Sequence, residues 1–284
     1  MHYPVLLAET LEYLAIRPDG LYLDATAGLG GHTGAIAAKL GTGSVISADR
    51  DEESLERAKE NNAALADKIR FVNARFSQLK EFVGERRADG LLADLGVSRF
   101  QLTDPERGFS LMSRGPVDMR MSRSDERTAG DLVNFASERE LADLLFYLGD
   151  ERRSRRIARA IVRARPIRDT LHLAGVVESA VPRTGSIHPA TQTFMALRIA
   201  VNQEREELEA LLKDAPSMVK PGGRIVILTF MSAEDRVVKQ AFQALARDGK
   251  AVLLNKHVVT PSEQEVSENP PSRSAKLRAV ELTR

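Results

Sequence analysis

The stretch Leu21-Tyr-Leu-Asp24-Ala-Thr-Ala-Gly28-Leu-Gly30-Gly31-His32 decides the fold. It joins a short apolar run to a glycine turn, and residues 31–40 after the turn have the composition of a helix that ends at Gly41. Glycine lets a backbone turn tightly and approach a ligand closely. A strand that passes through such a turn into a helix is typical of α/β proteins that bind a nucleotide there.

Strands and helices alternate around this turn. Three further apolar runs have the length of strands, at 45–48, 69–72 and 90–93. The segments that follow the first two of them have helical spacing, at 51–64 and 77–83. Asp49 and Asp94 directly follow the second and fourth strands of the series. This alternation predicts an α/β fold with a mostly parallel sheet and helices on both faces.

The alternation stops after residue 94 and resumes near residue 190. Between them the sequence predicts helices at 137–148, with a capping box of Ser137 and Glu140, at 151–164 and at 171–181, which ends at Pro182. A long helix at about 190–214, another helix after Ser232, and strands at 224–230, 251–259 and 277–283 then follow. We therefore expect one discontinuous domain, 1–103 with 189–284, and a helical insertion domain at 104–188.

The composition excludes several classes of site. Lys plus Arg is 41 and Asp plus Glu is 40, so any surface for nucleic acid must be local. Cysteine is absent, which excludes disulfides, zinc thiolates and cysteine nucleophiles, and the five histidines are scattered, so we expect no metal. No apolar run approaches the ~20 residues of a membrane span. Residues 1–4 lack the features of a secretory signal, and we expect a cytoplasmic protein.

The acidic residues at the strand ends predict the kind of ligand. Ligands of open parallel sheets bind beyond the carboxyl ends of the strands. Asp49 ends the strand next to the glycine turn, where a carboxylate can accept hydrogen bonds from two ribose hydroxyls. That arrangement serves NAD and S-adenosylmethionine alike.

Two details favour S-adenosylmethionine. Thr33 stands at the sixth position of the turn, where the dinucleotide fingerprint needs glycine. Asp24 precedes the turn, and its carboxylate suits a cationic methionine group and would repel a pyrophosphate. An NAD-dependent enzyme remains the alternative, which equilibrium binding of both cofactors would test.

Several longer motifs carry a family resemblance. They are His2 to Leu7, Asp94-Leu-Gly-Val-Ser-Arg-Phe-Gln101, Arg107 to Ser110, Val117 to Met121, His188 to Thr191, Ala196 to Asn202, Glu234 to Lys239, and Arg273 to Arg278. Taken together the chain resembles the bacterial ribosomal RNA small-subunit methyltransferase H family, also called MraW, over nearly its whole length. The resemblance implies a Rossmann-like class I methyltransferase with a helical insertion for RNA recognition. It also implies methyl transfer from S-adenosyl-L-methionine to N4 of a cytidine in the decoding region of 16S ribosomal RNA.

The resemblance also implies a set of cofactor contacts. They map onto Gly30, Gly31, His32, Asp49, Phe76, Asp94 and Gln101. The glycines and His32 would face the methionine end, Asp49 the ribose, and Phe76 would pack against adenine unless it is a core residue. Asp94 would bind the cofactor or the target amine, unless it is a helix or turn cap, and Gln101 can donate and accept.

Asp94 is our candidate catalytic residue. The Asp-Pro-Pro-Tyr motif of amino-methylating enzymes is absent, and Asp94-Leu-Gly-Val97 takes its place. We expect Asp94 or the carbonyl after it to accept a hydrogen bond from N4. Asp118 and Glu234 are secondary candidates, with a surface ion pair and a helix N-terminal charge as the alternative interpretations.

Some positions depart from the usual family pattern. They are Arg99 for serine, Thr103 for aspartate, Met195 for glutamine, Met231 for histidine and Pro271 for arginine. The cofactor contacts are intact, so the departures concern the target side. A non-catalytic RNA-binding or ribosome assembly factor that retains the cofactor pocket is the alternative function.

A run of arginines predicts the RNA contact. Residues 152–168 hold eight arginines, and Arg152, Arg156, Arg159 and Arg163 would share one helical face opposite Ile157, Ala160, Ile161 and Ala164. Guanidinium groups suit phosphate, although the face could instead be solvated and paired with Asp150 and Glu151. Lys276 forms a second small cluster with Arg273 and Arg278. Whether the substrate is free RNA or an assembled subunit, and whether the protein is a monomer or a homodimer, stay open.

Overall fold

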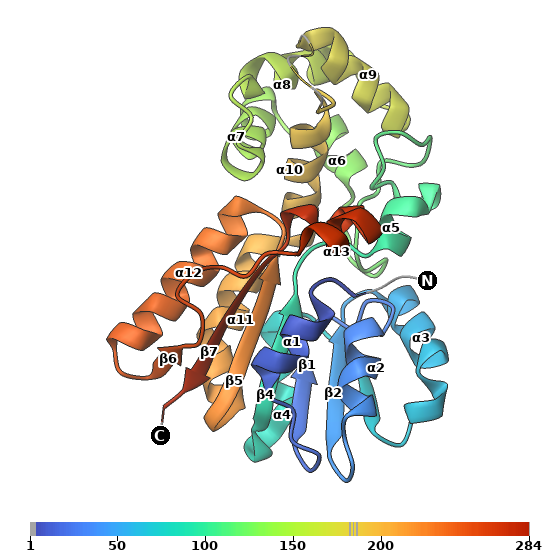
Figure 1. Cartoon of the computed structure of the whole chain (residues 1–284). Coiled ribbons are helices and arrows are strands. Elements are labelled where there is room, and N and C mark those ends of the chain that lie inside the picture. The colour runs from blue at the N-terminus through green and yellow to red at the C-terminus, as the bar shows by residue number, and fades with distance from the viewer. Residues whose placement is uncertain (1–3, 182, 184, 186, 284) are drawn as a thin grey trace. The chain divides into compact units, whose positions relative to one another are not determined.

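The computed structural model describes residues 4–181, 183, 185 and 187–283 (Figure 1). The chain divides into two compact units, one of residues 1–96 with 206–284 and one of residues 97–205. The second unit contains the predicted insertion 104–188 and extends beyond it at both ends. His2, Tyr3 and Pro182, which entered the sequence analysis, lie outside the described residues.

A seven-stranded sheet forms the centre of the first unit. Its strands are β1 (Leu21–Asp24), β2 (Ser44–Asp49), β3 (Ile69–Asn73), β4 (Ala88–Asp94), β5 (Val219–Thr229), β6 (Ala251–Leu253) and β7 (Lys276–Leu282). The order across the sheet is β3-β2-β1-β4-β5-β7-β6. The first five strands in this order are parallel, and β7 runs antiparallel to both of its neighbours. The predicted α/β fold with a mostly parallel sheet is confirmed.

Helices cover both faces of this sheet because its strands are apolar on both sides. On one face α4 (Leu79–Val83), α11 (Glu204–Met218) and α12 (Ser232–Arg247) pack on the strands through side chains such as Leu211 and Phe242. On the other face α1 (Leu7–Leu14) and α2 (Gly31–Ala38) do so, and α3 (Glu52–Asn61) packs against Phe71. All four residues of β1 are buried, as expected for a strand covered twice.

The second unit is helical in its described residues. Its helices are α5 (Arg99–Thr103), α6 (Ala129–Phe135), α7 (Glu138–Gly149), α8 (Ser154–Arg163), α9 (Thr170–Ala180) and α10 (Thr191–Asn202). They enclose a separate core that includes Leu145, Ile161 and Leu197. The predicted capping box begins α7, since Ser137 Oγ accepts from the Glu140 amide at 3.2 Å and the Glu140 carboxylate accepts from the Ser137 amide at 2.8 Å.

The structure corrects three local predictions. The helix expected at 190–214 is interrupted at Gln203, whose φ of 51° lies in the left-handed region, so α10 ends there and α11 begins. The strand expected at 251–259 ends at Leu253, and only Val259 returns to the sheet through a bridge to Leu277. Three further helices, α5, α6 and α13 (Glu263–Glu268), were not predicted from the sequence. These helices are short, and a single turn of helix has little periodicity to detect.

Candidate functional site

The glycine turn leads from β1 into α2. Gly28 and Gly30 have φ values of 51° and 85°, in the region that favours glycine. A Cβ on Gly30 would lie 2.2 Å from Asn62 Nδ2, which donates to the Gly30 carbonyl at 3.1 Å. Gly30 therefore needs glycine for two reasons, and Asn62, which the sequence analysis missed, holds the turn from behind.

Asp49 ends β2 beside this turn. Its Oδ2 accepts from the Gly28 amide at 2.7 Å and its Oδ1 from the Asp51 amide at 2.9 Å. Burial raises the pKa of Asp49 to about 6, although both amide hydrogen bonds oppose the rise. Each oxygen keeps a lone pair, so the carboxylate can still accept the pair of ribose hydroxyls for which it was predicted.

Asp24 lies under the turn in a network of hydroxyl groups. Thr33 Oγ1 donates to Asp24 Oδ2 at 2.6 Å and lies 2.7 Å from Ser47 Oγ. The Thr26 amide donates to Asp24 Oδ1 at 3.1 Å. Burial is the main cause that raises the pKa of Asp24 to about 7. Thr33, which distinguished this turn from a dinucleotide fingerprint, thus orients the buried carboxylate.

Asp94 ends β4, the strand on the other side of β1. Its amide donates to Thr26 Oγ1 at 2.7 Å, so Thr26 contacts both carboxylate-bearing strand ends. Its Oδ1 is buried and has no hydrogen-bond partner within the described part of the chain. Burial, together with the nearby charge of Asp24, raises the pKa of Asp94 to about 8. An orphaned buried carboxylate oxygen marks a position that a ligand can complete.

His32 lies in the first turn of α2 and approaches Asp94. The side chain is buried, with Nδ1 3.6 Å from Asp94 Oδ2 and Nε2 3.0 Å from the Val5 carbonyl oxygen. The neighbouring Gly31 packs on Pro4, whose Cγ would lie 2.6 Å from a Cβ at that position. Residues 4 and 5 therefore close over the start of α2.

These residues fit a cationic methyl donor. Asp24, Asp49 and Asp94 all lie at the carboxyl edge of the sheet, and all three have raised pKa values because burial disfavours their charged forms. A sulfonium and an ammonium group would offset that penalty, whereas a pyrophosphate would increase it. The first unit thus brings together Gly30, Gly31, His32, Asp49 and Asp94.

Two predicted cofactor contacts remain, Phe76 and Gln101. Phe76 begins a short 3-10 helix after β3, at the same edge of the sheet, where its half-buried ring packs against the core. Gln101 belongs to the second unit, in α5. Its Oε1 accepts from the Ser98 amide at 2.8 Å, so it also forms a capping box.

The two secondary acidic candidates take up structural interactions. Asp118 forms a two-pronged ion pair with Arg120, at 2.7 and 2.9 Å, which lowers the pKa of Asp118 despite its burial. Glu234 lies in the first turn of α12 and accepts from the Met231 amide at 3.3 Å. Both contacts match the alternative interpretations, an ion pair and a helix N-terminal charge. Met231, where the family usually has histidine, is the residue that precedes α12.

The predicted C-terminal basic cluster is partly neutralised. Lys276 pairs with Thr229 at the carboxyl edge of the sheet, and its Nζ lies 3.2 Å from Ser232 Oγ. Arg278 instead donates two hydrogen bonds to Asp235, at 2.6 and 3.0 Å, and is nearly buried. Arg278 is therefore ion-paired, whereas Arg273 is exposed and Lys276 is half-exposed.

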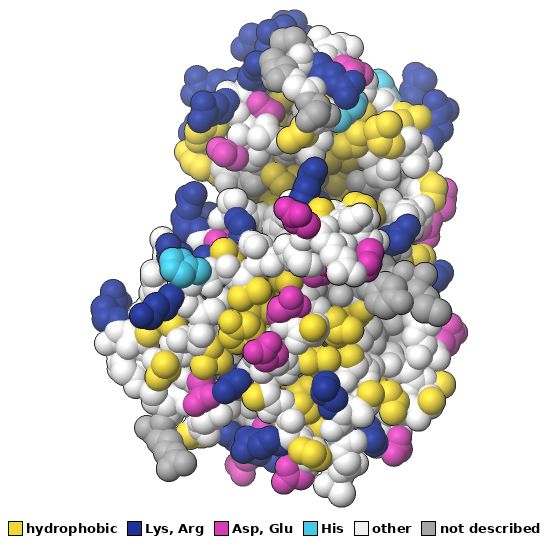
Figure 2. Space-filling view, in the orientation of Figure 1, with side chains coloured by type: hydrophobic (Ala, Val, Ile, Leu, Met, Phe, Trp, Pro, Cys, Tyr) yellow, Lys and Arg dark blue, Asp and Glu magenta, His cyan; other side chains and the backbone are white. Residues whose placement is uncertain are grey.

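Helix α8 presents exposed arginines over an apolar face, as predicted. Ile157 and Ile161 are buried, while Arg156, Arg159 and Arg163 are exposed (Figure 2 shows Lys and Arg side chains in dark blue over α8 and α9). Arg152 is a correction, because it lies in the turn before α8 and not on its helical face. Arg159 is paired with Glu138 at 3.3 Å, whereas Arg156 and Arg163 form no ion pair with any described residue.

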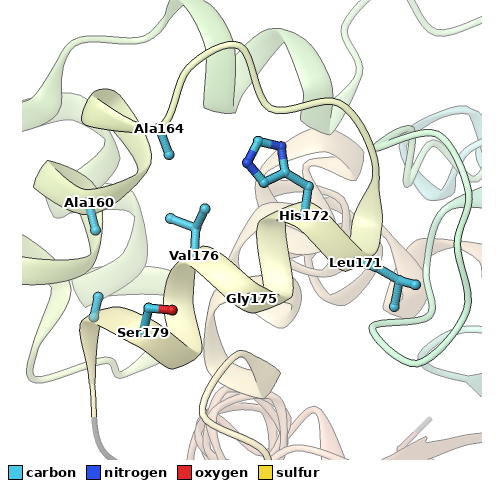
Figure 3. A pocket seen from close by; sticks show the side chains of 8 residues that line it. Ala160, Ala164, Leu171, His172, Gly175, Val176 and Ser179 are labelled. Atoms are coloured by element: carbon cyan, nitrogen blue, oxygen red, sulfur yellow. The ribbon is translucent and has the colours of Figure 1, made fainter.

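A shallow hollow of about 480 Å³ lies between α8 and α9. Ala160 of α8 and Ala164, the residue after the end of α8, line it, and His172 and Val176 face them from α9 (Figure 3). Most of its lining is apolar or small. It lies beside the arginines of α8 and contains none of the predicted cofactor residues.

Membrane-spanning helices and metal sites were also sought among the described residues. None of the described helices is long and apolar enough to cross a bilayer. Among the same residues no group of three or more histidine and acidic side chains could hold a metal ion. The site residues that the sequence analysis missed are Thr26, Asn62 and Val5. Only Thr26 had a signal, because an aspartate two residues before a threonine is a turn pattern.

Comparison with known proteins supports a methyltransferase site at the carboxyl edge of the sheet. Residues 1–283 match the family described as the MraW methylase family. A ribosomal RNA small subunit methyltransferase H from Solibacter usitatus (strain Ellin6076) is 59% identical, over 99% of this chain and 100% of that one. Proteins of the same name from Koribacter versatilis (strain Ellin345) and Acidobacterium capsulatum are 49% and 48% identical, over 98% and 99% of this chain and 93% and 98% of theirs. The chain is an S-adenosylmethionine-dependent methyltransferase that belongs to the MraW methylase family.

Proposed function

We propose that this methyltransferase modifies 16S ribosomal RNA in the small ribosomal subunit, at the exocyclic N4 amine of a cytidine in the decoding region. The names of its relatives support ribosomal RNA of the small subunit as the substrate class. The observation that carries the choice of an amine is the Asp94 carboxylate, whose buried Oδ1 has no partner among the described residues. An amine hydrogen would supply that partner.

S-adenosylmethionine supplies a methyl group on a sulfonium that leaves as a neutral thioether, so the site needs no strong acid. The protein must instead prepare the nucleophile. The lone pair of a cytidine N4 is delocalised into the ring, and a hydrogen bond to Asp94 Oδ1 would favour the more tetrahedral nitrogen that attacks. Alignment of the amine with the methyl group supplies much of the rest, up to ~7–11 kcal/mol in the best intramolecular cases.

The residues that would hold the cofactor are those predicted. Gly30, Gly31 and His32 would border its methionine end, and Asp49 would accept from the ribose. Phe76 would pack against adenine from its position after β3. Gln101 would supply a further polar contact.

The RNA would contact exposed cations. Arg156 and Arg163 on α8 lack an ion pair among the described residues, Arg152 is exposed in the preceding turn, and Arg159 would exchange Glu138 for phosphate. Lys276 lies at the carboxyl edge near the end of β5 and would contact RNA close to the reacting amine. Such a substrate places the protein in the cytoplasm.

Mass spectrometry of ribosomal RNA from cells with and without the protein tests this proposal. We expect one N4-methylcytidine of the decoding region to lose its methyl group without the protein. Wild type should restore it, as should Asp19→Ala, a control at an exposed turn, whereas Asp94→Ala should not. Near-normal turnover by Asp94→Ala would remove Asp94 from the mechanism. A wild type that binds the subunit and the cofactor but transfers no methyl group would identify an assembly factor.

A further inference from the structure

The Val5 carbonyl selects the tautomer of His32. A carbonyl oxygen can only accept, so the 3.0 Å contact with Nε2 requires the hydrogen of the neutral ring to be on Nε2. Nδ1, on the other side of the ring, then carries a lone pair when the ring is neutral. It carries a proton only when the ring is an imidazolium.

The 3.6 Å approach of Nδ1 to Asp94 Oδ2 couples the charges of the two side chains. A lone pair directed at a carboxylate is repulsive, so an ionised Asp94 favours the proton on Nδ1. A neutral His32 favours the proton on Asp94. The two groups therefore share one proton, and each charge state of one selects a charge state of the other.

Resting on the proposed function, we propose that His32 is a positioning residue that acts through Asp94: its Nδ1 proton keeps the Asp94 carboxylate ionised to receive the proton of the methylated amine. Asp94 uses its two oxygens for different tasks. Oδ2 contacts His32, and the unpartnered Oδ1 accepts from the substrate. The burial that raises the pKa of Asp94 makes such help necessary near neutral pH.

The step balances in atoms and charge. The N4 lone pair forms a bond to the methyl carbon while the carbon–sulfur bond breaks and its electron pair stays on sulfur. The nitrogen, now cationic, transfers one proton to Asp94 Oδ1. The pair then holds two protons, one on His32 Nδ1 and one on Asp94, and one of them leaves to solvent with the products.

Other charged groups that act on Asp94 are few. Asp24 at the end of β1 raises the pKa of Asp94, and Asp49 at the end of β2 in turn raises that of Asp24. The bound sulfonium acts in the opposite sense. His32 is thus the cationic side chain, among the described residues, that the structure records beside Asp94.

The first test separates this role from cofactor binding. In His32→Gln the amide can still donate to Val5 but has no proton to lose. We expect kcat to fall about 100-fold, as for loss of acid–base assistance, a larger change than any rise in the Kd for S-adenosylmethionine, whose methionine end His32 would border. The acidic limb of the kcat profile should move to higher pH. In His32→Asn the amide nitrogen takes the place of Nδ1 and can donate to Asp94, so part of kcat should be recovered. The control variant His257→Gln, at an exposed position, should leave kcat and its pH profile unchanged.

A readout without turnover completes the test. In ¹⁵N-labelled protein bound to S-adenosylhomocysteine, His32 should be an imidazolium in wild type and neutral in Asp94→Asn at the same pH. Unchanged kcat and pH profile in His32→Gln, or a His32 signal indifferent to Asp94→Asn, would overturn the proposal. If the His32 signal responds but wild type methylates no cytidine, the coupling stands and the proposed function fails.

Discussion

The carboxyl edge of the sheet and helix α8 each concentrate one sign of charge but treat it in opposite ways. At the edge Asp24 is buried and Asp49 and Asp94 are half-buried, and burial raises the pKa of each. On α8 the apolar residues are buried and the arginines remain in solvent. A buried charge is costly until a partner arrives, whereas an exposed one costs little and is screened by salt. The edge therefore suits one cation in one place, and we propose that the exposed arginines of α8 suit a polyanion.

The largest effect should come from the edge. Asp49→Ala removes the acceptor for the ribose hydroxyls, and because hydrogen bonds to charged groups contribute about 1.5–3 kcal/mol, affinity should fall about 10–100-fold. Calorimetric titration with S-adenosylmethionine measures this loss. Asp49→Asn keeps one carbonyl oxygen, so its Kd for S-adenosylmethionine should lie between those of wild type and Asp49→Ala. An unchanged Kd in Asp49→Ala would show that the carboxylate only holds the Gly28 and Asp51 amides.

An intermediate effect should appear in the stability of the protein without methyl donor. The pKa of Asp94 is about 8 in the folded chain against an ordinary 3.8, so the folded state holds this proton more strongly. The stability it contributes is complete below pH 3.8 and is lost as pH rises through about 8. Asp94→Asn cannot lose a proton, so its Tm should exceed that of wild type above pH 8. The expected gain is about 2–4 °C for each kcal/mol.

Thermal melts of the two proteins at pH 5 and pH 9 measure this difference. The gain should be smaller at pH 5 than at pH 9, because at pH 5 Asp94 is still protonated in the folded wild type and only the loss between pH 3.8 and 5 has occurred. Asp19→Asn, at an exposed turn, should match wild type at both pH values. An equal gain at both pH values would mean that the amide packs better and that the charge of Asp94 is not the cause.

The smallest effect should come from α8. The double variant Arg156→Ala with Arg163→Ala removes two cations that form no ion pair with a described residue. The slope of log K against log salt for RNA binding should become shallower by roughly 1.5. The salt-dependence slope should fall less in Arg159→Ala than in Arg156→Ala, since Arg159 must first break its ion pair with Glu138 to bind a phosphate. Filter binding to 16S RNA at several salt concentrations gives these slopes. The control is Arg86→Ala with Lys250→Ala, two exposed cations at the amino edge of the sheet. An equal loss of slope in that control would assign the effect to net charge alone.

The strand ends were the most predictable part of the molecule. Each apolar run that stops at an aspartate produced a strand whose last residue is that aspartate, at Asp24, Asp49 and Asp94. Parallel strands place such residues at one edge, so the meeting of the three carboxylates followed from pattern and topology. The helix break at Gln203 did not follow, because a left-handed residue other than glycine has no sequence signature.

The pairing of charges was the least predictable part. Arg278 and Arg273 look alike in the sequence, yet Arg278 pairs with Asp235, whereas the exposed Arg273 has no partner among the residues that the structure describes. Arg159 meets Glu138 rather than the predicted Asp150 or Glu151. Partners far apart in sequence are chosen by how elements pack, and no spacing rule contains that information.

The sequence by itself determined the alternation of strands and helices, the glycine turn and the acidic residues at the strand ends, because these depend on local backbone preferences and periodicity. Only the tertiary structure decided what each charge does. It buried Asp94 with an unpartnered oxygen and turned the Val5 carbonyl toward His32 Nε2. Burial and hydrogen bonding set the charge of a side chain, and both arise only when distant segments pack together.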